Sequence, residues 1–442
     1  MKQLLLSLGL ITTLSVTALA QSGPENNNWP QWRGPKETGA ALYGNPPSKF
    51  GENENIRWKT EIPGKGHATP IVWEDKIIVL TAVATDKKPD GKVPDAEGNR
   101  VAAMSPTKTE LIHQFKVVLV DKKTGSILWD KTVKEEVPIE STHALGSWAS
   151  NSPVTDGENI YAYFGSRGLY CLDFKGNIKW EKDFGQMQTV MSFGEGSSPS
   201  LYKDKLVVVW DHEAGSFITA LDKKTGKELW KVDRDEGTSW ASPLVLEVDG
   251  KAQVITAATK KVRSYDFETG SIIWECTGLT RNVIPNPVFG DGILYVMSGY
   301  RGNTLLAIDL KRAKGDITGT DVILWSYNQD TPYTPSPLLM DGKLYFLRAN
   351  NGEITCLDAK TGAVQYSKQK LEGITNTYSS PTGAPGMIFI AGDKIVNVIE
   401  AGGTFKVLSS NVLEDTFEAS PVIIGDDIFL RGAKSLYCIG RK

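Results

Sequence analysis

Short apolar runs separated by polar turns recur along the chain from about residue 55 onward. Typical runs are 206–210, 293–297 and 343–347, each reached through a turn that contains Lys-Asp or Asp-Gly. These runs are rich in β-branched and aromatic residues and are about five residues long, which is the length and composition of β-strands. The pattern therefore predicts an all-β protein.

The strands group into repeats that each start with Ser, Thr or Asn followed by Pro. The eight starts are Thr69-Pro70, Ser152-Pro153, Ser198-Pro199, Ser242-Pro243, Asn286-Pro287, Ser336-Pro337, Ser380-Pro381 and Ser420-Pro421. Successive prolines are 83, 46, 44, 44, 50, 44 and 40 residues apart. An all-strand repeat of about 40 to 50 residues is typical of β-propellers. We therefore predict an eight-bladed β-propeller with four antiparallel strands in each blade.

A second motif ends each repeat, as in LDKKTGKELW at 221–230. Its Asp accepts backbone N–H groups across a turn, its Gly takes the positive φ that the turn requires, and its Trp lies on the outermost strand. We expect these residues to join neighbouring blades rather than to bind a ligand, because the blade peripheries lie far apart. The structural positions are Trp58, Asp121, Gly125, Trp129, Asp173, Trp180, Asp222, Gly226, Trp230, Asp266, Gly270, Trp274, Trp325, Asp358 and Gly362.

The eighth repeat ends at 438–442 without a fourth strand. Residues 55–62 carry Trp58 ahead of the first Thr-Pro, so we expect them to complete the last blade and close the ring, which removes two exposed sheet edges. This gives a propeller over 55–442 preceded by an N-terminal arm at 21–54. The long first spacing holds a polar segment at 85–110, which we interpret as a loop inserted in blade one.

Residues 1–20 have the pattern of a secretory signal peptide, with Lys2, an apolar run and small residues at Ala18 and Ala20. We therefore expect a periplasmic or secreted protein. No later segment is apolar enough to cross a membrane, and Gln21 stands where a lipid-bearing Cys would be needed. A formal net charge of −3 gives no basic field for nucleic acid. Four cysteines, Cys171, Cys276, Cys356 and Cys438, are too few for a disulfide scaffold.

The two motifs together resemble the repeats of the pyrroloquinoline quinone (PQQ)-like propeller family, and the resemblance covers about residues 56–442. Within that family it implies either a quinoprotein dehydrogenase or a non-enzymatic propeller such as the scaffold lipoprotein of the outer-membrane β-barrel assembly machinery. The segment WPQWRGP at 29–35 is similar to the entry segment of exported PQQ-like proteins. The chain has no adjacent cysteine pair and no large insertions, and both departures count against the dehydrogenase.

The residues just before each repeat start are the candidates for contact with a ligand, because these loops surround one mouth of the channel. They are His67, Trp148, Glu195, Trp240, Arg281, Asn282, Tyr333, Asn376, Tyr378, Phe417 and Glu418. We expect a non-catalytic scaffold of the cell envelope that binds protein or peptide partners, with no cofactor and no metal site.

One alternative is a PQQ- and Ca²⁺-dependent alcohol or sugar dehydrogenase. In that enzyme Trp240 or Trp148 would stack on the quinone, and Glu195, Asn282 or Glu418 would surround Ca²⁺. A third hypothesis is carbohydrate recognition by the aromatic side chains of the mouth. The residues leave the identity of the partner and the oligomeric state open.

Overall fold

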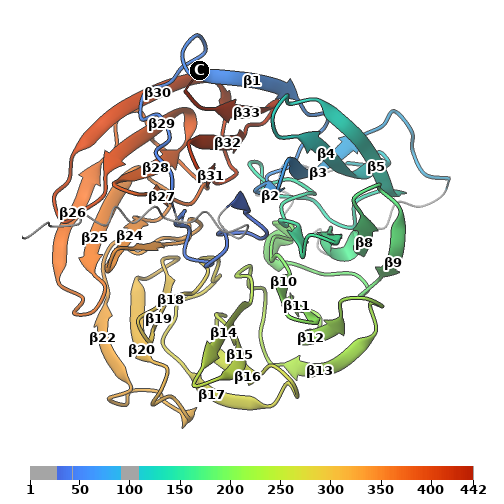
Figure 1. The fold of residues 1–442 in the computed structure, drawn as a ribbon. Helices are drawn as coiled ribbons and strands as arrows, with labels where there is room; N and C mark the ends of the chain where they lie inside the picture. The colour runs from blue at the N-terminus through green and yellow to red at the C-terminus, as the bar shows by residue number, and fades with distance from the viewer. Residues whose placement is uncertain (1–26, 42, 91–108, 442) are drawn as a thin grey trace, which may run out of the picture.

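The computed structural model describes residues 27–41, 43–90 and 109–441, and the strands of these residues form eight antiparallel sheets arranged as a ring (Figure 1). The predicted eight-bladed β-propeller is therefore confirmed. The predicted signal peptide and most of the predicted inserted loop lie outside the described residues. The flanks of that loop leave β3 and enter β4, which pair with each other in blade one.

Blades one to four follow each other along the chain, with the strands of each running from the channel outward. Blade one contains β2 (Ile71–Trp73), β3 (Lys76–Ala84), β4 (His113–Asp121) and β5 (Ile127–Glu136). Blade two contains β6 (Val154–Thr155), β7 (Asn159–Tyr163), β8 (Leu169–Asp173) and β9 (Ile178–Lys182). Blade three contains β10 (Ser200–Tyr202), β11 (Lys205–Trp210), β12 (Ser216–Asp222) and β13 (Glu228–Arg234). Blade four contains β14 (Leu244–Val248), β15 (Lys251–Thr256), β16 (Val262–Asp266) and β17 (Ile272–Cys276).

Blades five to eight complete the ring. Blade five contains β18 (Val288–Gly290), β19 (Ile293–Ser298), β20 (Thr304–Asp309) and β22 (Ile323–Tyr327). Blade six contains β23 (Leu338–Met340), β24 (Lys343–Leu347), β25 (Glu353–Asp358) and β26 (Val364–Lys370). Blade seven contains β27 (Thr382–Ala384), β28 (Met387–Ala391), β29 (Asp393–Glu400) and β30 (Val407–Thr416). Blade eight contains β31 (Val422–Ile424), β32 (Asp427–Arg431), β33 (Ser435–Ile439) and β1 (Ile56–Glu61).

Strand β1 pairs antiparallel with β33, so the N-terminal strand closes the last blade. One short strand is additional to the four-stranded plan. Strand β21 (Gly315–Asp316) comes from the lengthened turn of blade five and pairs parallel with β17. It covers the outer edge of blade four, which would otherwise present unpaired backbone groups. Two single-turn 3₁₀ helices, η3 (Gly165–Arg167) and η4 (Val190–Ser192), lie in connections between strands.

The Trp of each repeat motif joins its own blade to the next one. Trp230 on β13 is buried, and its Nε1 donates to the Phe267 carbonyl of blade four at 3.0 Å. Its ring lies flat against Gly270, where an added Cβ would come within 2.8 Å of the ring atom Cε3. Only glycine fits beneath this ring. Glycine also adopts the φ of 75° found there, because it has no Cβ to strain that conformation. Trp58, Trp129, Trp180 and Trp325 donate in the same way to carbonyls of the following blade.

A closed circle of hydrogen bonds surrounds the channel at the repeat starts. In each blade the backbone N–H of the residue before Pro donates to the side-chain oxygen of the same residue in the next blade, as between Ser152 and Ser198 at 2.8 Å. The other seven links have the same form, and Ser420 donates back to Thr69 to complete the circle. The Ser, Thr or Asn of each start therefore joins the innermost strands of neighbouring blades.

The N-terminal arm crosses the centre of the ring (Figure 1). Its residues extend the inner strands, since Trp29 pairs with Val72 in blade one and Ala40 pairs with Gly383 in blade seven. Arg33 is 2% exposed, and its Nη2 donates to the carbonyls of Pro337 and Pro381. The arm thus connects the inner strands of blades one and seven and the starts of blades six and seven.

Candidate functional site

A cavity of about 410 Å³ opens where the connections of all eight blades enter their innermost strands. We call it the mouth cavity. Its lining residues are Trp32, His67, Thr69, His143, Leu145, Gly146, Ser147, Ser150, Ser152, Phe193, Gly194, Glu195, Gly196, Ser198, Trp240, Ile284, Tyr300, Tyr333, Thr334, Tyr378, Glu418 and Ser420. Its volume lies within the ~300–1,000 Å³ typical of pockets for small molecules.

Aromatic rings make up much of the cavity wall. Tyr300 and Tyr333 stack on each other with ring centroids 4.8 Å apart and planes 24° apart. Trp240 is fixed at both ends, because its backbone N–H donates to Val283 O at 2.8 Å and its Nε1 donates to Gly194 O at 2.7 Å. Side chains with two fixed contacts lose little freedom on binding, so this wall is a preformed surface.

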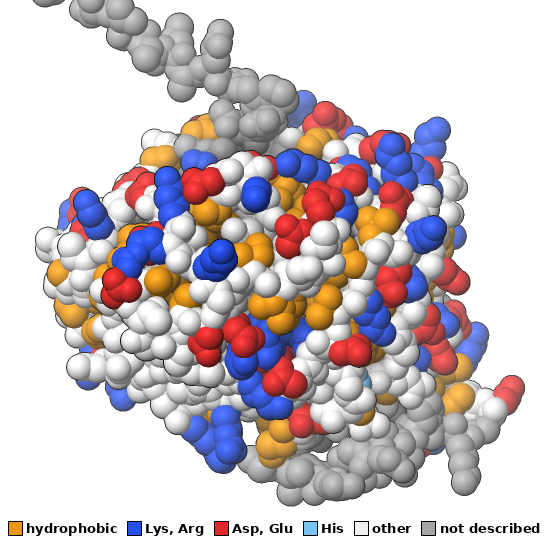
Figure 2. Space-filling model, turned by 90° about the horizontal axis from the view of Figure 1, so that it is seen from below, with side chains coloured by type: hydrophobic (Ala, Val, Ile, Leu, Met, Phe, Trp, Pro, Cys, Tyr) orange, Lys and Arg blue, Asp and Glu red, His pale blue; other side chains and the backbone are white. Residues whose placement is uncertain are grey.

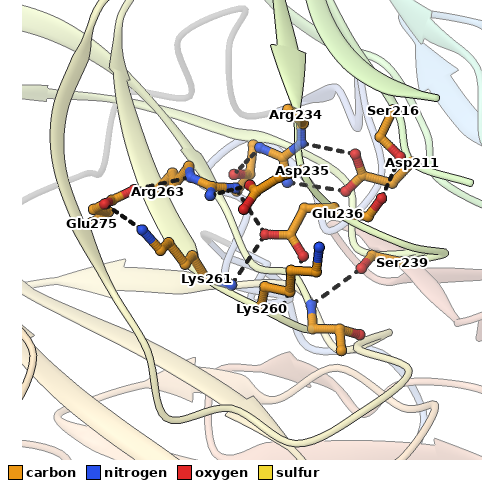
Figure 3. A network of polar contacts seen from close by, with 12 residues as sticks. Asp211, Ser216, Arg234, Asp235, Glu236, Ser239, Lys260, Lys261, Arg263 and Glu275 are labelled. Atoms are coloured by element: carbon orange, nitrogen blue, oxygen red, sulfur yellow. Dashed lines mark hydrogen bonds and ion pairs between the residues drawn. The ribbon is translucent and has the colours of Figure 1, made fainter.

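A buried ionic network holds the connection that leads to Trp240 (Figure 3). Arg234 at the end of β13 forms a two-point ion pair with Asp211, and both side chains are at most 1% exposed. Two residues later, Glu236 accepts from Arg263 Nη1 at 2.8 Å and from the backbone of Lys260 and Lys261. The network fixes the backbone on both sides of residue 235 and so limits movement of the loop that ends at Trp240.

Glu195 faces the cavity from the connection between blades two and three. Its carboxyl accepts the Ser166 N–H at 2.6 Å and the Ser166 hydroxyl at 2.5 Å. Burial raises the pKa of Glu195 to about 7. Behind it, burial raises the pKa of Glu140 to about 8, and the nearby Glu195 adds to this shift. Both carboxyls therefore have substantial neutral populations near pH 7.

The connections that lead into blades one and eight bring His67 and Glu418 to the cavity. Burial, with smaller contributions from Lys65 and Arg431, lowers the pKa of His67 to about 3, so its imidazole is neutral. Burial raises the pKa of Glu418 to about 7, an effect that Lys65 opposes. Arg431 is 1% exposed, and its guanidinium has no hydrogen-bond partner among the described residues. The cavity thus combines groups that are neutral or partly neutral with cations set behind its wall.

The predicted mouth residues separate into two groups. Those that line the cavity are His67, Glu195, Trp240, Tyr333, Tyr378 and Glu418, and those that do not are Trp148, Arg281, Asn282, Asn376 and Phe417.

The five predicted residues that do not line the cavity have other contacts or lie elsewhere on the molecule. Phe417 is 1% exposed and packs edge-on against Tyr437, because neighbouring residues of an extended segment point in opposite directions and Glu418 takes the cavity side. Trp148 donates to Glu140 O and contacts His113 behind the wall. Asn282 contacts Tyr333 from outside. Arg281 is exposed and Asn376 half-buried.

Sequence reasoning missed several cavity residues, notably Trp32, His143, Phe193 and Tyr300. Trp32 belongs to the arm, whose place in the channel depends only on long-range contacts. His143 lies in the connection between blades one and two and contacts the rings of Phe193 and Tyr378. A search of every connection facing the mouth, rather than of selected positions three to six residues before each Pro, would have found the last three.

The residues grouped in sequence as Ca²⁺ ligands have different surroundings in the structure. The Glu195 carboxyl accepts two hydrogen bonds from Ser166, Asn282 lies against Tyr333, and Glu418 lies near Lys65. Within the described part of the chain, no three His, Cys, Asp or Glu side chains come together as metal ligands. Ca²⁺ takes six to eight oxygen ligands, and the carboxylates of the described residues form no such cluster.

Comparison with known proteins identifies the repeats. The family model described as outer membrane protein assembly factor BamB, of the PQQ-like repeat type, matches residues 113–368, more than half of the chain. The chain belongs to this family. The assembly factor BamB of Yersinia pestis is 22% identical over 329 residues, which are 71% of this chain and 77% of that protein.

Solved structures of family members and of enzymes share the fold. BamB from Moraxella catarrhalis superposes with a TM-score of 0.54 at 14% identity, covering 82% of this chain and all of that one. Quinohemoprotein alcohol dehydrogenase from Comamonas testosteroni gives a TM-score of 0.61 at 10% identity, covering 94% and 81%. At these identities the likeness shows the fold alone. None of the described helices has the length and apolar character needed to cross a membrane.

Proposed function

We propose that this protein is a non-catalytic assembly factor of the bacterial cell envelope, which binds protein partners during the assembly of outer membrane proteins. The observation that carries the proposal is the match of the BamB family model over 113–368, supported by the relative from Yersinia pestis. The predicted signal peptide at 1–20 supports a periplasmic location. The proposed activity needs no cofactor.

The mouth side of the ring is the surface that we assign to the partner. Connections from all eight blades meet there on a rigid frame, and binding residues are commonly found on such connections. Leu145 lies on this side and is 40% exposed. A partner that covered this side chain would gain the free energy of burying its apolar surface.

Deletion of the gene tests the proposed role in the organism that makes the protein. We expect lower amounts of folded outer-membrane β-barrel proteins, restored by the wild-type gene. A photo-cross-linking residue at Leu145 should capture a partner in intact cells. The same residue at Leu229, which is 44% exposed on an outer strand, is the matched control.

Two outcomes would contradict the proposal. Unchanged β-barrel levels with no cross-link at Leu145 would remove the assembly role. Dye-linked alcohol or sugar oxidation after addition of PQQ and Ca²⁺ to the purified protein would favour a dehydrogenase instead. A cross-link at Leu229 alone would move the partner from the mouth to the rim.

A further inference from the structure

The mouth cavity contains hydrogen-bond donors that the structure does not use elsewhere. Thr69, Ser152, Ser198 and Ser420 belong to the circle of repeat starts and also line the cavity. Each oxygen accepts a backbone N–H from the neighbouring blade. A hydroxyl that accepts in this way keeps one hydrogen, which it can donate. The cavity is therefore lined by several hydroxyls, each with one hydrogen left to donate.

Acceptors and flat apolar faces complete the wall. The Glu195 and Glu418 carboxyls and the neutral His67 ring supply acceptors from three different blade connections that line the cavity. Between them lie the faces of Trp32, Trp240 and the stacked pair Tyr300 and Tyr333. A ligand for this wall must offer apolar faces and also edges that both donate and accept hydrogen bonds.

Groups of both charge signs surround the cavity, so neither an anion nor a cation meets a wall of purely opposite charge. An anion would lie close to Glu195 and Glu418, which it would force to stay protonated. A cation would lie close to Lys65 and to the buried Arg431, both of which contribute to the electrostatics of His67. Burying an unpaired charge in such a site is costly, whereas a neutral polar ligand needs only hydrogen bonds.

We propose that the mouth cavity binds a neutral carbohydrate of one or two pyranose rings. The C–H faces of such a ring stack on aromatic side chains, and its hydroxyls accept from the Ser and Thr hydroxyls while donating to the carboxyls. The volume of about 410 Å³ is in the range for a ligand of this size. The proposal is independent of the assembly role, because sugar binding needs no protein partner.

Isothermal titration calorimetry on the purified protein tests the proposal with D-glucose, N-acetyl-D-glucosamine, maltose and cellobiose. We expect saturable binding of at least one of them. D-glucuronate and D-glucosamine have the same ring with one charge, and we expect each to bind about tenfold or more weakly than its neutral counterpart.

Cavity variants locate the binding. Tyr333→Leu and Trp240→Leu each remove one aromatic face and should weaken binding about two- to tenfold. Tyr202→Leu, a half-buried tyrosine outside the cavity, is the matched control and should bind like the wild type. If Tyr333→Leu does not fold, Tyr300→Leu removes the other ring of the stacked pair.

Three results would overturn the proposal. These are the absence of saturable heat with every neutral sugar, equal affinity of the wild type and the folded cavity variants, and saturable binding of a Trp-containing tripeptide in place of the sugars. The last result would assign the cavity to a partner's side chain. None of them affects the test of β-barrel assembly, which is measured in cells.

Discussion

Single side chains in this propeller have clear tasks because the repeat places the same residue in several blades. The Trp of the outer strand covers the Gly of the next blade and donates to a carbonyl beside it in several blades, as Trp230 does with Gly270 and Phe267, whereas Trp274 is buried without a partner for its Nε1 among the described residues. Burial of a large aromatic ring contributes about 1.5–3 kcal/mol or more to stability. The repeated Thr-Gly and Trp residues are therefore two halves of one joint.

Substitution of Trp230 separates these two contributions. Trp230→Ala leaves a cavity between blades three and four and should lower the free energy of unfolding by about 3–5 kcal/mol. Trp230→Phe keeps much of the ring contact but loses the hydrogen bond to Phe267 O, and should cost about 1–2 kcal/mol. Denaturant unfolding followed by far-UV circular dichroism measures both. Equal small losses would show that the ring contributes little to the joint.

Glu140 makes stability depend on pH. Its pKa is about 8 in the folded protein and near 4.5 when unfolded, so the folded state binds more protons between these values. Stability must then fall as pH rises from 4.5 to 8. His67 acts in the opposite sense below pH 6.5, because its folded pKa is about 3. The window from pH 6.5 to 8 therefore isolates the buried carboxyls.

Thermal unfolding across that window tests the assignment. We expect the wild-type melting temperature to fall as pH rises from 6.5 to 8, and the fall to be smaller in Glu140→Gln, which cannot ionise. Glu158→Gln changes an exposed residue and should leave the slope as in the wild type. Identical slopes in Glu140→Gln and the wild type would contradict the burial of a neutral carboxyl.

Neighbouring blades are joined at two distances from the centre of the ring. The Trp and Gly pairs join their outer strands, and the circle of Ser, Thr and Asn joins their inner strands. The inner circle explains why every repeat start has a side-chain oxygen before Pro. Proline holds the preceding residue in an extended conformation, so its N–H and side chain point consistently towards neighbouring blades. Period and composition predicted the blades, but not this circle.

The inner circle predicts a specific cost for loss of one hydroxyl. Ser198→Ala leaves the buried N–H of Ser152 without its acceptor and should destabilise the protein by about 1–3 kcal/mol. Ser198→Thr keeps the oxygen, as Thr69 does at the same position of blade one, and should cost much less. Equilibrium unfolding in urea compares the two. A neutral Ser198→Ala would mean that the circle adds no stability.

What the sequence could predict follows from where the contacts lie. The ring and its closure by β1 were predicted because the repeat spacing and Trp58 are local signals. The position of the arm across the ring was not predicted. Trp29, Trp32 and Arg33 belong to no repeated motif, and their contacts are with residues far away in the sequence. The cavity was found in part: its connections follow from the repeat, but which side chain of each points inward depends on backbone details that the period does not fix.

The complete ring has one open mouth and a charged rim. Figure 2 shows the rim over the blades at the bottom of Figure 1, where basic, acidic and apolar side chains are interspersed. No large patch of one sign appears on this face, in agreement with a net charge of −3. The mouth cavity, which Trp32 of the arm helps to line, is the surface that we propose for specific binding.

Two truncations distinguish the tasks of the N-terminal residues. A chain starting at Asn55 keeps β1 but lacks the N-terminal arm, and we expect it to fold with a lower melting temperature because the contacts of Trp29 and Arg33 are lost. A chain starting at Pro63 also lacks β1, which leaves β33 with an unpaired edge. It should be much less stable or aggregate, since open edges pair between molecules.

Thermal unfolding and size-exclusion chromatography measure both effects. If the two truncated chains had the same stability, β1 would contribute nothing to ring closure. If the chain starting at Asn55 matched the full protein, the arm would be a removable segment rather than part of the folded core. Retention of sugar binding by that shorter chain would further show that Trp32 is dispensable to the mouth cavity, whereas its loss in a folded chain would make the arm part of the binding site.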